Sequence, residues 1–266
     1  MAVFLSKEDL NLSNEFENKG YIIKDIKDLE LLNSIEKFFS NFVLKRLKIK
    51  KNVNSQDLLN KFHNFINIQQ LNSFRLDIIS FLNDLKDFRK NYYYLAKYYL
   101  DSLVGNELVM QNRINLSIQI PKDSSSLLPV HSDVWSGDSP FEVVVWLPLV
   151  NCYKTKSMYI LPPKKYQKFK KEFKKIASND SEKIYHHIKK DLDWINIKYG
   201  QILIFNQSLP HGNRVNIEKE TRWSMNCRFK SIFSPYGDKK IGEFFEPITL
   251  RKMSEVGINY ELPKIK

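Results

Sequence analysis

The chain has 266 residues, 42% of them hydrophobic, which is enough to bury a substantial core and argues against wholesale disorder. Lys and Arg number 42 and Asp and Glu number 30, so the net charge is +12 and favours acidic partners such as nucleic acid, anionic membrane or phosphorylated small molecules. The only two cysteines, Cys152 and Cys227, lie far apart and outside any C-x-x-C pattern, which excludes a disulfide framework and a cysteine-rich zinc site and favours a reducing cytoplasm.

The start of the chain has no basic segment followed by an apolar one, and no apolar run reaches the roughly 18–20 residues that a membrane span needs. We therefore expect neither a signal peptide nor a membrane span, and a cytoplasmic location.

The first region, residues 1–105, is predicted to be mainly helical. The segment GYIIKDI (Gly20–Ile26) indicates one short strand, and apolar residues then recur at helical spacing from about Asp28 to Leu103. Gly and Pro are absent from Tyr21 to Val104, as suits a run of packed helices. We expect these helices to pack on the sheet that follows, although the sequence leaves open whether they form a dimer interface instead.

A change of period at Leu108 marks the second region, residues 106–235. In VMQNRINLSIQI (Val109–Ile120) polar and apolar residues alternate, which predicts a single strand with one polar face. Many short strands in succession are typical of a sandwich or barrel. The further predicted strands are Leu128–Trp135, Phe141–Val150, Lys156–Pro162, Asp193–Lys198, Gly200–Gln207, Gly212–Ile217 and Thr221–Phe233.

A lysine-rich helical insert, residues 163–191, interrupts these strands, and residues 236–266 form a C-terminal tail. The insert is interpreted either as a solvated outer helix or as a contact surface for an anionic partner.

Two of the predicted strands carry polar stripes. One stripe runs from Gln111 to Gln119, and the other consists of Arg222, Ser224, Asn226 and Arg228, alternating with aromatic and sulfur side chains. Two arginines opposite such apolar residues indicate a polar interior, and a barrel with a polar interior can hold a ligand.

Candidate metal ligands occur at two places. His131 and Asp133 form an H-x-D motif, and residues i and i+2 of a strand point to the same side, so both side chains can bind one ion. His211 follows the predicted strand Gly200–Gln207. Two imidazoles and one carboxylate are the ligands expected for mononuclear Fe(II) with three open positions, although zinc accepts the same ligand types. Arg222, eleven residues after His211, could bind the far carboxylate of a 2-oxo acid and so favours iron.

The segments HSD, GQILIFNQSLPHGN and TRWSMNCRF resemble the double-stranded β-helix oxygenases that depend on Fe(II) and 2-oxoglutarate, and look closest to the phytanoyl-CoA dioxygenase-like branch. The similarity spans about Leu108 to Phe233. It implies an α+β fold with a jelly-roll or cupin-like barrel, iron on His131, Asp133 and His211, and the oxoglutarate carboxylate on Arg222. Halogenating relatives lack the carboxylate of the H-x-D motif, so Asp133 favours hydroxylation of a C–H bond, coupled to conversion of oxoglutarate to succinate.

The resemblance leaves other cofactor-binding assignments open. Arg228, on the same face as Arg222, and Lys156 are alternatives for the oxoglutarate carboxylate. Trp146 is similar in position to a tryptophan that lines the oxoglutarate pocket in the phytanoyl-like branch, with simple core packing as the alternative. Asn115 and Gln119 could bind oxoglutarate or each other.

The loop after the metal motif, VWSGDSPFE, is expected at the barrel mouth. There Trp135, Asp138 and Glu142 could contact a polyhydroxylated substrate, or the loop could be stabilised by its own turn. The stretch resembles a subgroup of these oxygenases found among carbohydrate-biosynthesis genes, which implies a small polar substrate such as a sugar or a nucleotide- or phosphate-linked sugar.

Two other functions stay open on sequence grounds. An AlkB-like nucleic-acid dealkylase would suit the charge and the R-x5-R spacing of Arg222 and Arg228, but it would need a basic groove with stacking aromatic residues, and the sequence shows only scattered tyrosines. A cupin-like binding module without catalysis is the non-enzymatic alternative, and the intact set of three metal ligands argues against it.

Overall fold

The computed structural model describes residues 4–50, 53–176 and 180–264. Its centre is a seven-stranded sheet with the order β1-β7-β4-β9-β2-β10, in which β3 also pairs with β9. All of these pairings are antiparallel. The strands are β1 (Tyr21–Asp25), β2 (Leu108–Gln111), β3 (Asn115–Gln119), β4 (Val143–Pro148), β7 (Gln201–Asn206), β9 (Arg222–Ser231) and β10 (Phe245–Thr249).

A second sheet has three short strands in the order β6-β5-β8: β5 (Tyr159–Ile160), β6 (Asp193–Trp194) and β8 (His211–Gly212). A cavity lies between the two sheets, because its wall takes residues from β4, β7 and β9 on one side and from β8 on the other. Two antiparallel sheets around a ligand-sized cavity confirm the predicted α+β jelly-roll architecture.

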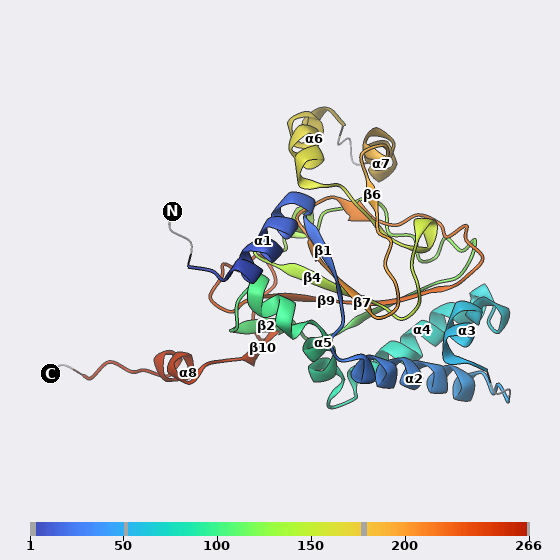
Figure 1. Cartoon of the computed structure of the whole chain (residues 1–266), viewed down its shortest axis with the longest axis horizontal. Coiled ribbons are helices and arrows are strands. Elements are labelled where there is room, and N and C mark those ends of the chain that lie inside the picture. The colour runs from blue at the N-terminus through green and yellow to red at the C-terminus, as the bar shows by residue number, and fades with distance from the viewer. Residues whose placement is uncertain (1–3, 51–52, 177–179, 265–266) are drawn as a thin grey trace.

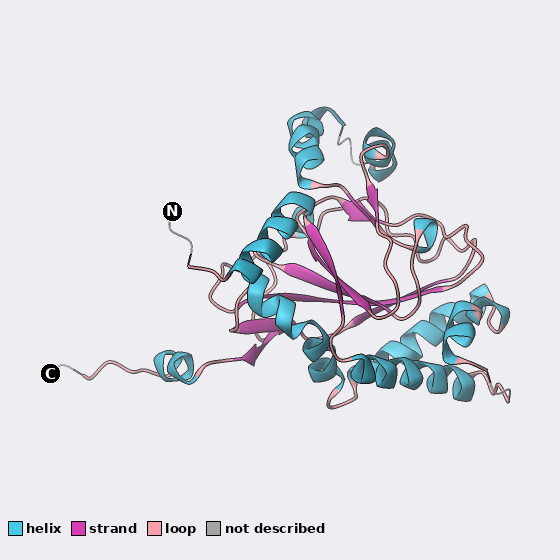
Figure 2. Ribbon diagram, in the orientation of Figure 1, coloured by secondary structure: helices cyan, strands magenta, loops and turns pink. Residues whose placement is uncertain are grey.

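Helices cover the outside of both sheets (Figures 1 and 2). Those that precede β2 are α1 (Lys7–Lys19), α2 (Leu29–Arg46), α3 (Ser55–Asn60), α4 (Ile68–Asn83) and α5 (Phe88–Leu103). In the basic insert, α6 (Pro163–Ile176) and α7 (Ser181–Ile188) cover the small sheet, where Val130 and Tyr159 pack with Phe169, Ile184 and Ile188. No helix in the described ranges is long and apolar enough to cross a membrane.

Strand β9 separates the core from the cavity. Trp223, fully buried, faces the N-terminal helices and packs its ring 4.9 Å from that of Phe62 and 6.2 Å from that of Phe74. The alternate residues Arg222, Asn226 and Arg228 line the cavity. Burying one face against helices leaves the polar face of β9 turned inward, as its alternating sequence predicted.

Several predicted strands are shorter than expected. The strand predicted at Val109–Ile120 is broken into β2 and β3, because the side chain of Asn83 bonds the backbone N–H of Ile114 at 2.9 Å and its carbonyl at 3.2 Å. That contact removes Ile114 from the sheet ladder.

Two further segments also depart from strand geometry. In the Leu128–Trp135 segment the only sheet pairing is an isolated bridge between His131 and His211. From Asp133 the chain forms a 3-10 helix, η2 (Asp133–Ser136). The Gly212–Ile217 segment forms no strand after Gly212, because the Asn216 side chain closes a local turn by bonding the carbonyl of Glu220 at 2.8 Å.

The C-terminal tail contains a strand that the sequence did not predict. Strand β10 pairs with β2 at the edge of the large sheet, and a short helix α8 (Lys252–Ile258) then extends away from the body (Figure 1). The segment between β9 and β10 contacts the loop after the H-x-D motif, where Asp238 N–H bonds the carbonyl of Gly137 at 2.9 Å.

Candidate metal centre and cavity

The three predicted metal ligands come together in the cavity. Candidate ligand atoms of His131, Asp133 and His211 all lie within 4.8 Å of one another. Asp133 Oδ1 is 3.4 Å from His131 Nε2 and 4.0 Å from His211 Nε2, and the two imidazole centroids are 4.3 Å apart. These separations suit three atoms that share one metal ion.

Backbone pairing explains this convergence. His131 N–H bonds the carbonyl of His211 at 3.0 Å, and His211 N–H bonds that of His131 at 2.8 Å. Gly212 allows the close approach, because a Cβ atom on this residue would lie 2.7 Å from the carbonyl oxygen of Leu128 and 2.9 Å from that of Pro129. A larger residue at position 212 would therefore displace the chain beside His211.

Each histidine is oriented by the backbone. His131 Nδ1 lies 2.9 Å from the carbonyl oxygen of Pro129, and His211 Nδ1 lies 2.8 Å from that of Leu209. A carbonyl oxygen can only accept, so Nδ1 carries the proton and donates in both rings. The Nε2 atoms are left as acceptors that face Asp133, which is the arrangement of histidines that bind a metal.

Burial and charge keep these ligands ready to bind a cation. Burial lowers the pKa of His211 to about 4, assisted by His131, so the imidazole is neutral at pH 7. Burial acts against ionisation of Asp133, but the contacts of its carboxylate with His131, His211 and Arg228 outweigh burial and hold the pKa of Asp133 well below its usual range. A neutral imidazole and an ionised carboxylate are the forms that ligate metals.

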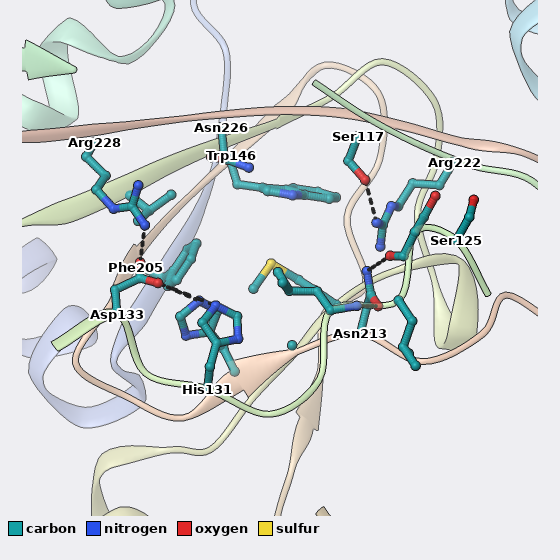
Figure 3. A pocket seen from close by; sticks show the side chains of 17 residues that line it. Ser117, Ser125, His131, Asp133, Trp146, Phe205, Asn213, Arg222, Asn226 and Arg228 are labelled. Atoms are coloured by element: carbon teal, nitrogen blue, oxygen red, sulfur yellow. Dashed lines mark hydrogen bonds and ion pairs between the residues drawn. The ribbon is translucent and has the colours of Figure 1, made fainter. Parts of the chain in front are cut away.

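The cavity beside these ligands measures about 280 Å³, close to the lower end of the range for small-molecule sites. Figure 3 shows Trp146 above the cavity, with Arg228 near Asp133 and Arg222 near Ser117. The two arginines lie six residues apart on β9, or roughly 20 Å along an extended strand, so they serve opposite parts of the cavity.

Arg222 is buried without a carboxylate partner among the described residues. Its Nη2 donates to Ser117 Oγ at 2.9 Å and its Nη1 to the carbonyl of Ser157 at 3.2 Å, while its buried Nε has no partner. Burial lowers the pKa of Arg222 to about 10. The hydroxyls of Ser157 and Ser224 and Oε1 of Gln119 are also buried without partners. Such a cation lacks the anion that would offset its desolvation.

The other predicted cofactor-binding residues differ in placement. Trp146 lines the cavity. Asn115 is exposed and donates to Asn226 Oδ1 at 3.0 Å, and only Asn226 lines the cavity. Gln119 lies outside the lining and donates to the carbonyl of Arg214 at 2.7 Å. Lys156 is also outside, because its fully buried ammonium bonds Asn60 Oδ1 at 2.6 Å and Glu220 Oε2 at 2.7 Å.

The three predicted substrate-binding residues also lie outside the cavity lining. Trp135 is partly exposed and its ring centroid is 5.0 Å from that of Phe173 on α6. Asp138 is buried and accepts from Lys239 Nζ at 2.7 Å with both oxygens. Glu142 is buried and accepts from Gln207 Nε2 at 2.7 Å. Both carboxylates are therefore bound within the protein and not presented to a substrate.

Sequence reasoning missed several residues of the cavity wall. Ser125, Ser126 and Leu128 come from the loop before the H-x-D motif, and Asn213 follows His211. Arg75 on α4 fixes this loop, since Nη1 donates to Ser125 Oγ at 2.9 Å and Nε to the carbonyl of Ile118 at 3.2 Å. The serine run before the motif was the available signal, whereas nothing in the sequence linked Arg75 to it.

Comparison with known proteins gives likeness in structure alone, since no protein-family model and no curated protein sequence matches the chain. The structure is similar to ThoJ, a non-heme monooxygenase in a nickel complex, with a TM-score of 0.56, 13% identity, and coverage of 91% of this chain and 85% of that chain. The structure is also similar to HygX from Streptomyces hygroscopicus with nickel and 2-oxoglutarate bound, with a TM-score of 0.50, 13% identity, and coverage of 87% of this chain and 89% of that chain. For EctD from S. alaskensis in its apo form the TM-score is 0.50 and the identity 15%, with coverage of 90% of this chain and 83% of that chain. At these identities the likeness establishes the fold alone, and the chain shares the jelly-roll fold of these three proteins.

Proposed function

We propose that this chain is an oxygenase that depends on Fe(II) and 2-oxoglutarate, with His131, Asp133 and His211 as the iron ligands. The donor set supports the proposal, because two imidazoles and one carboxylate would leave three positions open on a six-coordinate ion. His131, Asp133 and His211 would hold the iron and leave room on it for a 2-oxo acid and dioxygen. When bound, the iron and 2-oxoglutarate together would supply the oxidation of a C–H bond, coupled to conversion of oxoglutarate to succinate.

The buried Arg222 is the observation that carries the choice of co-substrate. A guanidinium in the cavity without a carboxylate partner suits a ligand that brings its own carboxylate, and its planar fork can bind one bidentately. The unpartnered Nε of Arg222 offers a further donor. A zinc site would explain the three metal ligands, but it would leave the buried guanidinium of Arg222 without an anionic partner. HygX, which shares the fold, is described with nickel and 2-oxoglutarate bound.

Within this proposal the residues of the chain have distinct tasks. The carbonyls of Pro129 and Leu209 hold the imidazoles with Nε2 toward the metal. Trp146 and Phe205 provide apolar walls that exclude water from the reacting atoms. Asp133 supplies the third ligand and so favours hydroxylation over halogenation, as the sequence resemblance implied.

The substrate class is a finer proposal, supported by the sequence resemblance to the phytanoyl-CoA dioxygenase-like branch and its carbohydrate subgroup. We propose a small polar molecule such as a sugar or a nucleotide- or phosphate-linked sugar. The cavity of about 280 Å³ must also hold oxoglutarate, so it accommodates only the reacting end of such a substrate. Nucleic acid is the weaker alternative, because the aromatic residues of the cavity wall, Trp146 and Phe205, are both buried and offer no row of stacking surfaces.

The test is formation of succinate from 2-oxoglutarate by the purified chain with ferrous iron, in the presence of nucleotide-sugars or of methylated single-stranded DNA. We expect His211→Ala to abolish turnover, with His187→Ala as the matched control, because His187 is exposed on α7 and pairs with Glu172. Turnover that survives His211→Ala would contradict the assignment. Stimulation by methylated DNA and not by sugars would favour the dealkylase.

A further inference from the structure

Arg228 contacts the carboxylate of the candidate metal ligand on the side away from the histidines. Asp133 Oδ2 lies 2.9 Å from Arg228 Nη2, whereas Oδ1 is the oxygen that lies 3.4 Å from His131 Nε2 and 4.0 Å from His211 Nε2. The two oxygens of one carboxylate therefore have separate partners. Figure 3 shows Arg228 and His131 reaching Asp133 from different directions.

The guanidinium of Arg228 is itself held in place. Its Nε donates to Gln207 Oε1 at 2.9 Å, and Gln207 Nε2 donates to Glu142 Oε2 at 2.7 Å and to the carbonyl of Ser139 at 3.1 Å. Since Glu142 and the carbonyl both accept, the amide of Gln207 can only present its oxygen to Arg228. This chain of bonds fixes the plane of the guanidinium and with it the position of Oδ2.

Asp138 and two residues of the C-terminal segment complete the surroundings of Arg228. The Phe244 ring centroid lies 5.8 Å from the guanidinium, and Asp138 Oδ1 lies 3.7 Å from Nε and is paired with Lys239. The charge of Arg228 is therefore already met by acidic groups, in contrast to that of Arg222. A role in binding the free carboxylate of oxoglutarate thus suits Arg222 better.

We propose that Arg228 is a positioning residue that binds Oδ2 of Asp133 and so restricts this carboxylate to one ligand atom, Oδ1. The inference rests on the proposed metal site. A carboxylate can bind a metal through one or two oxygens. If Asp133 used both, two positions would remain on a six-coordinate ion, and a chelating 2-oxo acid would fill them. With Oδ2 bound to Arg228, a third position stays open for dioxygen.

The experiment compares the full chain with Arg228→Gln, each loaded with Co(II), whose visible absorption reports its coordination number. Affinities are measured for Co(II), for 2-oxoglutarate and for 2-oxobutyrate, which chelates a metal in the same way but lacks the far carboxylate. In Arg228→Gln we expect Co(II) affinity within threefold of the parent chain, an absorption change that signals an added ligand, and both oxo acids still bound within threefold, because two positions remain for them. Arg228→Lys keeps the charge but cannot bridge Gln207 and Asp133. Its Co(II) spectrum should lie between those of the parent chain and Arg228→Gln.

Two results would overturn the assignment: an unchanged Co(II) spectrum, or weakening of 2-oxoglutarate without weakening of 2-oxobutyrate. The last would make Arg228 the carboxylate clamp. Gln207→Leu tests the same bond network without removing the charge and should change the Co(II) spectrum in the same direction. Arg113→Gln, at an exposed arginine outside the cavity, is the control. If the parent chain bound neither Co(II) nor oxoglutarate, the proposed function would fail as well, so the two failures are distinguishable.

Discussion

The replacement Arg222→Met tests the proposed co-substrate site most directly. Methionine keeps an unbranched, adaptable side chain but removes the buried guanidinium. If Arg222 serves to bind the far carboxylate of oxoglutarate, its loss must weaken that ligand and cost the folded chain little. If Arg222 were instead a structural residue, its loss would destabilise the chain.

The magnitudes follow from the contacts of Arg222. Its pKa falls from 12.5 to about 10 because of burial, which corresponds to roughly 3 kcal/mol against the charged form. Removing this penalty offsets the loss of the hydrogen bonds to Ser117 and to the carbonyl of Ser157, each worth about 1.5–3 kcal/mol. We therefore expect the free energy of unfolding without ligand to fall by less than about 3 kcal/mol. Losing a buried charge pair with the co-substrate costs about 2–5 kcal/mol, or roughly 30-fold to several-thousand-fold in affinity.

The assay measures binding of 2-oxoglutarate and 2-oxobutyrate to the Co(II)-loaded chain, together with unfolding in urea. In Arg222→Met the dissociation constant of 2-oxoglutarate should rise at least 30-fold, and that of 2-oxobutyrate should stay within threefold. Equal weakening of the two acids would refute the clamp. A loss of 3–5 kcal/mol in unfolding free energy would show that Arg222 supports the fold instead.

Three further predictions concern the surroundings of the site. Since the folded pKa of His211 is about 4, below the ordinary 6.5, the unfolded chain takes up a proton first as pH falls from 6.5 toward 4. The metal-free chain should therefore lose up to about 3 kcal/mol of its unfolding free energy in that window, as measured in urea with a chelator, and the same slope in His211→Gln would contradict the reasoning. Gly212→Ala should reduce Co(II) affinity at least tenfold, because its Cβ would lie 2.7 Å from the carbonyl oxygen of Leu128, and unchanged affinity would show that the loop can move. Lys156→Met should leave the dissociation constant of 2-oxoglutarate within twofold, because the ammonium is bound outside the cavity, and a loss as large as that of Arg222→Met would make Lys156 the clamp.

The helical and strand regions were largely predictable because hydrophobic period reports the face that each element buries. The alternation in β9 showed that Arg222, Asn226 and Arg228 share a face, and the structure turns that face toward the cavity. Periodicity could not predict the break at Ile114, since the cause is a side chain on α4, 31 residues earlier. Strand β10 was missed because its pairing with β2 joins segments more than 130 residues apart.

The sequence by itself determined the types of the metal ligands and the polar face on which two arginines lie, because both follow from spacing along one chain. It could not distinguish Arg222, Arg228 and Lys156, which all carry the same charge. Only the tertiary structure distinguishes their surroundings, by placing acidic partners beside Arg228 and Lys156 and none among the described residues beside Arg222, which supports our proposal that Arg222 binds the oxoglutarate carboxylate. The tertiary structure also pairs Asp138 with Lys239 and Glu142 with Gln207. The physical reason is that the task of a charged side chain depends on the partners that burial brings to it from distant segments, and local sequence carries no record of those partners.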